Sequence, residues 1–185
     1  SQRKAKAARD AGHFKNEILP VEAPILGDNG EPSGDVSVID TDQGIRDSSA
    51  EGLAALKPIL EGGVHTAGNS SQISDGAAAV LYMSKEEAEA KGLKPLARML
   101  AHTRHSQEPD AFTTAPIGAI QKLLDKTGWT VGDIDLFEIN EAFAMVTMMA
   151  IQDLGLDPAK VNVNGGACAQ GHPIGSTGSR IMVTL

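Results

Sequence analysis

The sequence has little aromatic content and a single cysteine, and each shortage argues against a class of function. Of its 185 residues, 3% are aromatic, which disfavours a surface that stacks on bases or sugars. One cysteine, Cys168, permits neither an internal disulfide nor a cysteine-cluster metal site. With 16 basic and 24 acidic residues the net charge is −8, and phosphate neutralisation needs a basic surface. We expect no nucleic-acid partner and no metal.

Long apolar runs are also lacking. None approaches the roughly 20 residues that cross a bilayer. The chain opens with a basic stretch over residues 1–9, and no apolar stretch follows it as in a signal peptide. We therefore expect a soluble, cytoplasmic protein without a membrane partner. Its hydrophobic fraction of 41% is ordinary for a globular protein with a core.

The apolar periodicity alternates between helix and strand, which predicts a layered α/β fold. The predicted helices cover residues 1–12, 50–60, 85–91, 115–126, 141–154 and 181–185. The predicted strands cover residues 80–83, 134–139 and 161–163, and an irregular surface hairpin covers residues 14–40. The helix over 141–154 is apolar on nearly all faces, so it needs cover on every side. Too few strands remain to supply that cover, and the chain ends inside an apolar run, so we expect it to be part of a larger protein.

Two polar residues stand where such folds bind ligands. Asn140 lies between a predicted strand and the apolar helix, where it can either cap the helix or face a ligand at the strand end. His172 lies between Gly171 and Pro173 in the glycine-rich loop GGACAQGHPIG at residues 165–175. An imidazole held there can take a proton from a thiol or hydroxyl and donate a hydrogen bond to an oxyanion.

The role of Cys168 stays open between two interpretations. It lies four positions before His172, so the two could form a nucleophilic Cys–His pair. Free cysteine is also among the residue types most often buried, and the tight turn around it favours a structural role.

Several stretches together resemble one family, the thiolases. These stretches are NEAFA at residues 140–144, NVNGGA at 162–167, GHPIGSTGSRI at 171–181, TAGNSS at 66–71 and SDGAAAV at 74–80. Residues 1–2 and 12–21 are similar to the loop domain of the same family. The matches keep their order over essentially the whole chain.

The resemblance implies a layered αβαβα fold, here incomplete, in three parts. Residues 1–63 would be a loop domain that contacts CoA and other subunits, 64–92 the tail of the N-terminal core domain, and 93–185 most of the C-terminal core domain. Thiolases condense two acyl-CoA molecules or cleave a 3-ketoacyl-CoA with CoA. Coenzyme A is a substrate, so no cofactor is expected, and a homo-oligomer, dimer or tetramer, is implied.

The resemblance also assigns site residues. His172 would activate a nucleophilic cysteine and polarise the thioester oxygen, and Asn140 would hold a water that completes that oxyanion site. The remaining assignments concern substrate binding: Ser71 for a pantetheine amide, Ala67, Gly68 and Ser70 for close passage of the pantetheine chain, Phe112 and Phe143 for the thioester pocket, and Arg46 for the adenine nucleotide end.

The family's two catalytic cysteines have no counterpart among these residues, since Cys168 matches neither position. One would precede this sequence, and the other, in a Cys-x-Gly motif, would follow it. We therefore expect residues 1–185 alone to be neither stably folded nor active. The alternative from another class is a non-catalytic half that binds acyl-CoA or a partner chain.

Overall fold

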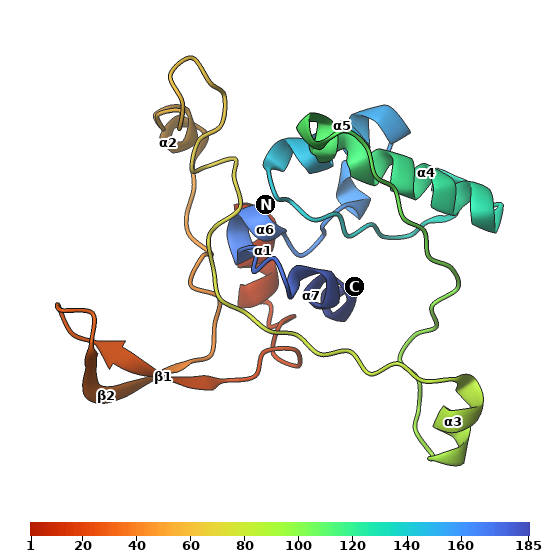
Figure 1. Ribbon diagram of the computed structural model, residues 1–185, viewed down its shortest axis with the longest axis horizontal. Helices are drawn as coiled ribbons and strands as arrows, with labels where there is room; N and C mark the ends of the chain where they lie inside the picture. The colour runs from red at the N-terminus through yellow and green to blue at the C-terminus, as the bar shows by residue number, and fades with distance from the viewer.

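The computed structural model describes all of residues 1–185 and is built mainly of short helices joined by long irregular segments (Figure 1). The helices are α1 Gln2–Asp10, α2 Ala50–Ala54, α3 Lys85–Ala90, α4 Ala115–Thr127, α5 Ala144–Leu154, α6 Ala167–Gln170 and α7 Thr177–Thr184, with 3-10 turns η1 Pro109–Thr114, η2 Val131–Asp133 and η3 Pro158–Lys160. The strands are β1 Val21–Leu26 and β2 Pro32–Ile39. No helix is long and apolar enough to cross a membrane.

The N-terminal helix and the hairpin confirm two predictions. Helix α1 ends before Gly12, whose φ of +79° is a left-handed conformation that glycine adopts without a Cβ clash. Strands β1 and β2 pair antiparallel from Val21↔Ile39 to Leu26↔Pro32. This pair is the sole sheet, and it projects away from the helices with most of its side chains exposed (Figure 1).

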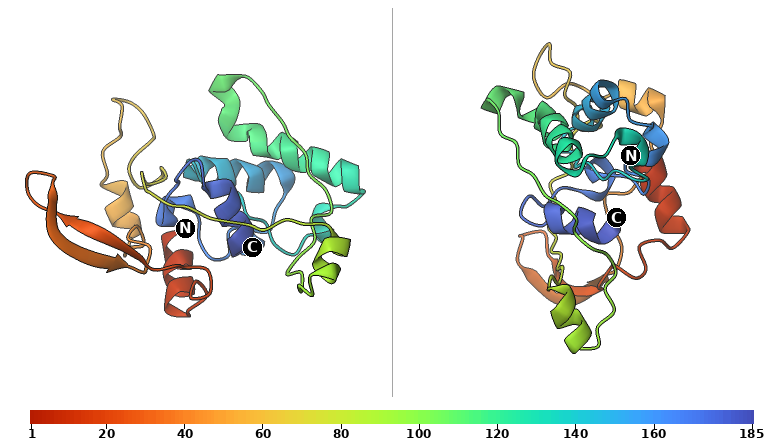
Figure 2. Two further views of the ribbon diagram at one scale, coloured as in Figure 1. Left: turned by 60° about the horizontal axis from the view of Figure 1, so that its bottom comes forward. Right: turned by 90° about the vertical axis from the view of Figure 1, so that its right-hand side faces the viewer.

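Helices α2 and α3 lie within long irregular segments of the chain. Helix α2 covers only the start of the helix predicted over 50–60. Helix α3 confirms the prediction over 85–91, with the Ser84 hydroxyl accepting from the Glu87 amide at its start. The strand predicted over 80–83 is wrong: Leu81 is 80% exposed and the segment pairs with no other strand. Figure 2 shows the long path between α2 and α3.

The C-terminal part is organised around α4 and α5. Helix α4 matches the prediction over 115–126 and ends at the left-handed Gly128. The strands predicted over 134–139 and 161–163 are wrong as strands, because they pair at one point only, a parallel bridge between Phe137 and Val161. A ladder needs consecutive paired residues, and no further neighbour extends this one.

Helix α5 starts later than predicted, at Ala144, and Phe143 occupies the N-cap position. Of the two alternatives for Asn140, the helix cap is therefore excluded. Residues 142–143 are held out of the helix by residues 69–71: the Ser71 amide donates to the Ala142 carbonyl oxygen at 3.0 Å, and the Ala144 amide at the helix start donates to the Asn69 carbonyl oxygen at 2.8 Å. The helix is not buried on all faces either, since Met148 is 66% exposed.

The end of the chain is more helical than predicted. Helix α6 interrupts the expected glycine loop, and α7 begins at Thr177, before the helix predicted over 181–185. Helix α6 lies against α1, and α7 follows it near the middle of the molecule (Figures 1 and 2). They bring the loop that carries His172 to the centre of the structure.

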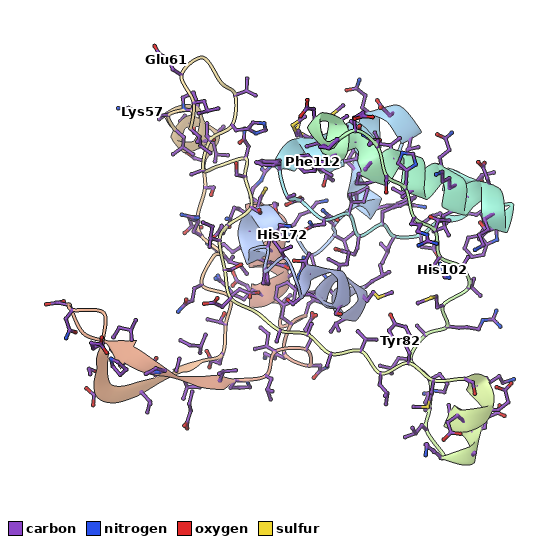
Figure 3. All side chains as sticks on the ribbon, viewed as in Figure 1. Lys57, Glu61, Tyr82, His102, Phe112 and His172 are labelled. Carbon is purple, nitrogen blue, oxygen red and sulfur yellow. The ribbon has the colours of Figure 1, made fainter.

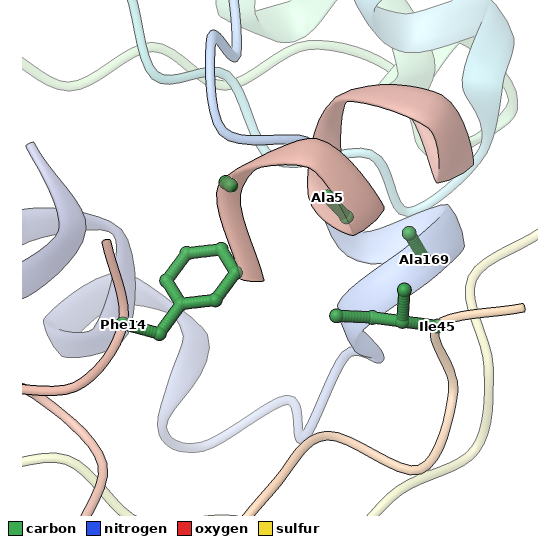
Figure 4. Close-up of a cluster of buried hydrophobic side chains, with 5 residues drawn as sticks. Ala5, Phe14, Ile45 and Ala169 are labelled. Atoms are coloured by element: carbon green, nitrogen blue, oxygen red, sulfur yellow. The ribbon is translucent and has the colours of Figure 1, made fainter. Parts of the chain in front are cut away.

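The core consists of two small clusters. One joins α1, the loop before α2 and α6 through Ala5, Ala8, Phe14, Ile45 and Ala169 (Figure 4). The other joins α5 to the bridged segments through Ile139, Val146, Ala150, Leu156 and Val161. Only 20 of 185 residues are buried, far fewer than a domain of this length normally encloses. The candidate site lies where the two clusters meet.

Candidate functional site

The structure brings Asn140 and His172 together. The Asn140 Nδ2 atom lies 3.4 Å from the His172 Nε2 atom, although the residues are 32 positions apart in sequence. Asn140 directly follows the buried Ile139 of the second core cluster. His172 follows α6 after Gly171, whose φ of +87° turns the chain sharply, and it lies centrally in the molecule (Figure 3).

A buried hydroxyl determines which ring nitrogen of His172 carries the proton. The Thr177 Oγ1 atom lies 2.7 Å from the His172 Nδ1 atom and 3.0 Å from the Pro173 carbonyl oxygen. With the hydroxyl proton on that carbonyl, as the 3.0 Å contact allows, Thr177 accepts from Nδ1–H. In the neutral ring the Nε2 lone pair then faces the Asn140 NH₂ donor at 3.4 Å. This is the tautomer that a general base needs.

The Asn140 side chain has a second notable atom. Its Oδ1 atom is buried and has no hydrogen-bond partner in the protein. Buried amide oxygens are normally satisfied, so an unsatisfied one suggests a ligand or a functional group that donates to it. The amide nitrogen toward His172 and the free oxygen together give a polar position that can bind a small donor.

A buried carboxylate lies beneath this pair. Glu141, 7% exposed, accepts a hydrogen bond from the Cys168 amide at 3.1 Å and another from the Asn162 Nδ2 atom at 3.2 Å. The Asn162 side chain also bonds both backbone groups of Ile139, at 2.8 and 2.9 Å. Ile139 and Glu141, the neighbours of Asn140 in the sequence, are therefore both held by hydrogen bonds.

Cys168 has a structural environment. Its side chain is buried, and burial together with the nearby Glu141 carboxylate raises the pKa of the thiol to about 12. The thiol contacts the Glu141 carbonyl oxygen at 3.9 Å. A nucleophilic cysteine needs a lowered pKa, so burial and the raised pKa favour the structural interpretation of Cys168.

The stretch TAGNSS folds as a compact turn beside the site. The Ser70 hydroxyl donates to the Thr66 carbonyl oxygen at 2.9 Å, and Ser70 and Phe143 form an antiparallel bridge. That bridge places Ser70 and Ser71 next to the segment that carries Asn140. Ala67 is exposed and Gly68 half-buried. A Cβ on Gly68 would lie 2.6 Å from the Leu53 side chain of α2, so glycine allows this turn to approach α2.

Three rings gather at the same place. The Phe143 ring centroid lies 4.7 Å from that of His65 and 6.2 Å from that of Phe112. Phe112 is 51% exposed and lies at the edge of this group (Figure 3). The two phenylalanines proposed from sequence are thus brought together. Arg46 is not: its amide donates to the Gln2 Oε1 atom at 2.9 Å, and its exposed side chain makes no hydrogen bond or ion pair.

Four residues of the site escaped the sequence interpretation: Gln72, Glu141, Asn162 and Thr177. Glu141 carried a usable signal, because it is the one charged residue between Asn140 and α5. Asn162 adopts a left-handed φ of +45°, which sequence alone does not reveal. No cluster of histidine, cysteine and carboxylate side chains suited to a metal is found.

Comparison with known families gives two consecutive matches. Residues 1–86 match the thiolase N-terminal domain, and residues 93–185 match the thiolase C-terminal domain. Nothing in these matches separates a loop domain within the first segment, so the boundary at residue 63 stays a prediction.

Relatives align over the full length of the chain. It is 48% identical to an acetyl-CoA acetyltransferase of Allochromatium vinosum and 46% identical to a steroid 3-ketoacyl-CoA thiolase of Mycobacterium tuberculosis, covering 46% and 43% of those proteins. The chain therefore spans about half the length of the curated relatives it matches.

Solved structures agree. The crystal structure of the Bacillus anthracis acetyl-CoA acetyltransferase superposes with a TM-score of 0.92 at 41% identity, covering all of this chain and 46% of that one. Human mitochondrial 3-ketoacyl-CoA thiolase gives 0.85 at 35% identity, covering all of this chain and 45% of that one. The layered thiolase α/β fold is confirmed for the part of it that these residues form. The chain belongs to the thiolase family.

Proposed function

We propose that this chain supplies acyl-transfer residues to a thiolase, an enzyme that condenses acyl-CoA molecules or cleaves 3-ketoacyl-CoA with CoA. The observation that supports this most strongly is the Asn140–His172 pair: the His172 Nε2 atom lies 3.4 Å from the Asn140 Nδ2 atom, and the Asn140 Oδ1 atom is buried and unpaired. Acetyl-CoA acetyltransferase and 3-ketoacyl-CoA thiolase are the names its relatives carry.

The chemistry assigns each residue of the pair a task. In cleavage, His172 Nε2 takes the proton from a cysteine thiol, and the thiolate attacks the ketone carbon, which becomes the carbonyl carbon of the transferred acyl group. As the carbon–carbon bond breaks, its electron pair passes to the departing acetyl-CoA as an enolate; the protonated ring donates a hydrogen bond to that thioester oxygen, and Asn140 fixes the water that is the second donor. A second cysteine, supplied like the first from outside these 185 residues, gives the enolate carbon a proton. The thiol of CoA then passes its proton to the second cysteine and removes the acyl group from the first as a new acyl-CoA.

The nucleophile of this proposal is not Cys168. Its thiol pKa near 12 leaves almost no thiolate at neutral pH. The acyl-carrying cysteine must therefore come from residues outside these 185. If no such cysteine is present in the whole protein, the alternative of a non-catalytic acyl-CoA-binding or partner-binding protein applies.

The substrate side of the proposal uses the turn over residues 66–71 and the two phenylalanines. Ser71 would bond a pantetheine amide, while Ala67, Gly68 and Ser70 let the pantetheine chain pass close to the backbone. Phe112 and Phe143 would line the thioester pocket. The turn and Phe143 lie next to the segment of Asn140, because Ser70 pairs with Phe143, which is three residues from Asn140 in the sequence. Arg46, exposed and free of ionic partners, would bind the anionic adenine nucleotide end.

Several wider features belong to the same proposal. Coenzyme A acts as a dissociable substrate and no resident cofactor is required. The division at residues 63 and 92, assembly as a homo-oligomer and a cytoplasmic location rest on the sequence and on the family resemblance.

The test is thiolysis of acetoacetyl-CoA by the full-length protein, followed as loss of its enolate absorbance when CoA is added. We expect turnover in the wild type and at least a hundredfold lower kcat in His172→Asn, in line with the usual share of acid–base catalysis of about 100-fold or more. His102→Asn is the matched control, because His102 is exposed and lies far from His172 (Figure 3).

Three results are distinguishable. Turnover that depends on His172 and not on His102 supports the proposal. Turnover that survives His172→Asn would contradict the assigned role of the imidazole. Saturable CoA binding without turnover in the wild type would favour the non-catalytic alternative.

A further inference from the structure

A buried carboxylate connects the segments that carry Asn140 and His172. Asn140 belongs to the segment after Ile139, and His172 to the loop after α6, so the pair needs a connection between those two segments. Glu141 provides one, because it follows Asn140 directly and its side chain bonds α6.

The carboxylate of Glu141 makes one hydrogen bond with each oxygen. Its Oε2 atom accepts from the Cys168 amide near the start of α6 at 3.1 Å, and its Oε1 atom accepts from the Asn162 Nδ2 atom at 3.2 Å. The backbone at Gly166 packs closely against this group. A Cβ on Gly166 would lie 2.5 Å from the Glu141 Cδ atom.

Asn162 extends the connection to the other side of Asn140. Its amide pairs with both backbone groups of Ile139, at 2.8 and 2.9 Å. Asn162 is 3% exposed. Asn140 thus lies between two residues that are both fixed by the same buried network.

The network reaches His172 through α6. This helix is one turn long, so a displacement at its start moves its end. At that end Gln72 Nε2 donates to the Cys168 and Ala169 carbonyl oxygens, at 3.2 and 3.1 Å. The Gln72 carbonyl oxygen accepts from the His172 amide at 3.1 Å. Helix α6 is therefore hydrogen-bonded to Glu141 near its start and to Gln72 near its end, and Gln72 also bonds the His172 backbone.

We propose that Glu141 is a positioning residue that sets the distance between His172 and Asn140. This rests on the proposed function for its kinetic consequence. The carboxylate is needed because it faces two donors, and both of its oxygens accept. A glutamine side chain has one acceptor oxygen and one NH₂ donor. Glu141→Gln therefore turns a donor toward another donor, either the Cys168 backbone N–H or the Asn162 Nδ2 group.

The test compares Glu141→Gln with the wild-type full-length protein in the thiolysis assay and by crystallography. A misplacement of about 1 Å in an active site costs about 100-fold in rate, so we expect kcat to fall by about that factor. KM for CoA and acetoacetyl-CoA should stay within about twofold, since Glu141 lies beneath the pair and not along residues 66–71. In the crystal, α6 and His172 should be displaced from Asn140. Asp135→Asn is the matched control, because Asp135 is exposed and makes no hydrogen bond.

Wild-type kcat in Glu141→Gln, with His172→Asn inactive, would overturn the positioning role and leave the proposed function standing. If the wild type has no turnover, the proposed function fails, and the crystal structures then decide: an unchanged Asn140–His172 distance overturns the role, and a lengthened one supports it. If Glu141→Gln does not fold, the same criteria are applied to Glu141→Asp, which keeps the charge and withdraws it by one methylene.

Discussion

The hydroxyl of Thr177 gives the sharpest test of how His172 is prepared for catalysis. Thr177→Val keeps the shape of the side chain and removes the oxygen that accepts from His172 Nδ1–H at 2.7 Å and donates to the Pro173 carbonyl at 3.0 Å. Thr177 is 3% exposed, so water does not easily replace it. Leaving a buried donor unpaired costs about 1–3 kcal/mol. If that cost falls on the reactive tautomer, kcat drops by about 5- to 150-fold, since 1.4 kcal/mol corresponds to about tenfold.

The assay is thiolysis by the full-length protein, with kcat and KM determined separately. Thr177→Ser is the matched control: it retains the hydroxyl and should keep kcat within about threefold, because only a methyl group is lost. Thr177→Val with wild-type kcat would refute the argument that this hydroxyl sets the tautomer. An equal loss in Thr177→Ser would also contradict it, because that variant retains the hydroxyl.

Three further predictions concern the full-length protein. Gly166→Ala places a methyl group 2.5 Å from the Glu141 Cδ atom and should destabilise by about 1–3 kcal/mol in chemical unfolding; Gly132→Ala, with its nearest contact at 3.6 Å, is the control, and equal stabilities would contradict the prediction. Cys168, with a thiol pKa of about 12, should resist iodoacetamide at pH 8 until the protein is denatured, as read by peptide mass spectrometry; rapid native labelling would be inconsistent with its burial. Burial raises the pKa of Glu138 from 4.5 to about 7, so its favourable contribution is complete below pH 4.5 and is lost as pH rises through 7. Glu138→Gln should therefore gain about 1 kcal/mol at pH 8, after discounting for partial exposure, and nothing near pH 4; a gain that does not depend on pH would contradict this.

The parts of the fold that the sequence predicted are those controlled by local chemistry. Helix α4 was predictable because its apolar spacing and the left-handed Gly128 lie within one continuous stretch. The hairpin was predictable from the turn residues around Gly30, whose φ is +77°. Such signals need no information about distant residues.

The failures depend on distant partners. The segments over 134–139 and 161–163 have the composition of strands, and a strand also needs a partner paired over several consecutive residues, whereas here they meet at one bridge. Helix α5 begins three residues later than predicted because residues 69–71 hold residues 142–143 outside the helix. Neither pairing can be predicted from the local sequence.

The candidate site also contains residues that the sequence predicted and residues that it did not. Asn140 and His172 stand in distinctive local contexts, and their juxtaposition agrees with the expectation. Thr177, Glu141 and Asn162 act through hydrogen bonds that span 5 to 27 positions, and only the folded chain reveals those. The sequence therefore indicated which groups can react, and the structure shows what orients them.

The most direct test of the account is a crystal structure of the full-length protein with acetyl-CoA bound. The account predicts that the thioester oxygen lies within hydrogen-bond distance of His172 Nε2, on the side facing Asn140, with the pantetheine chain passing residues 67–71. A thioester bound away from His172, or a pantetheine chain on another face of the molecule, would contradict it.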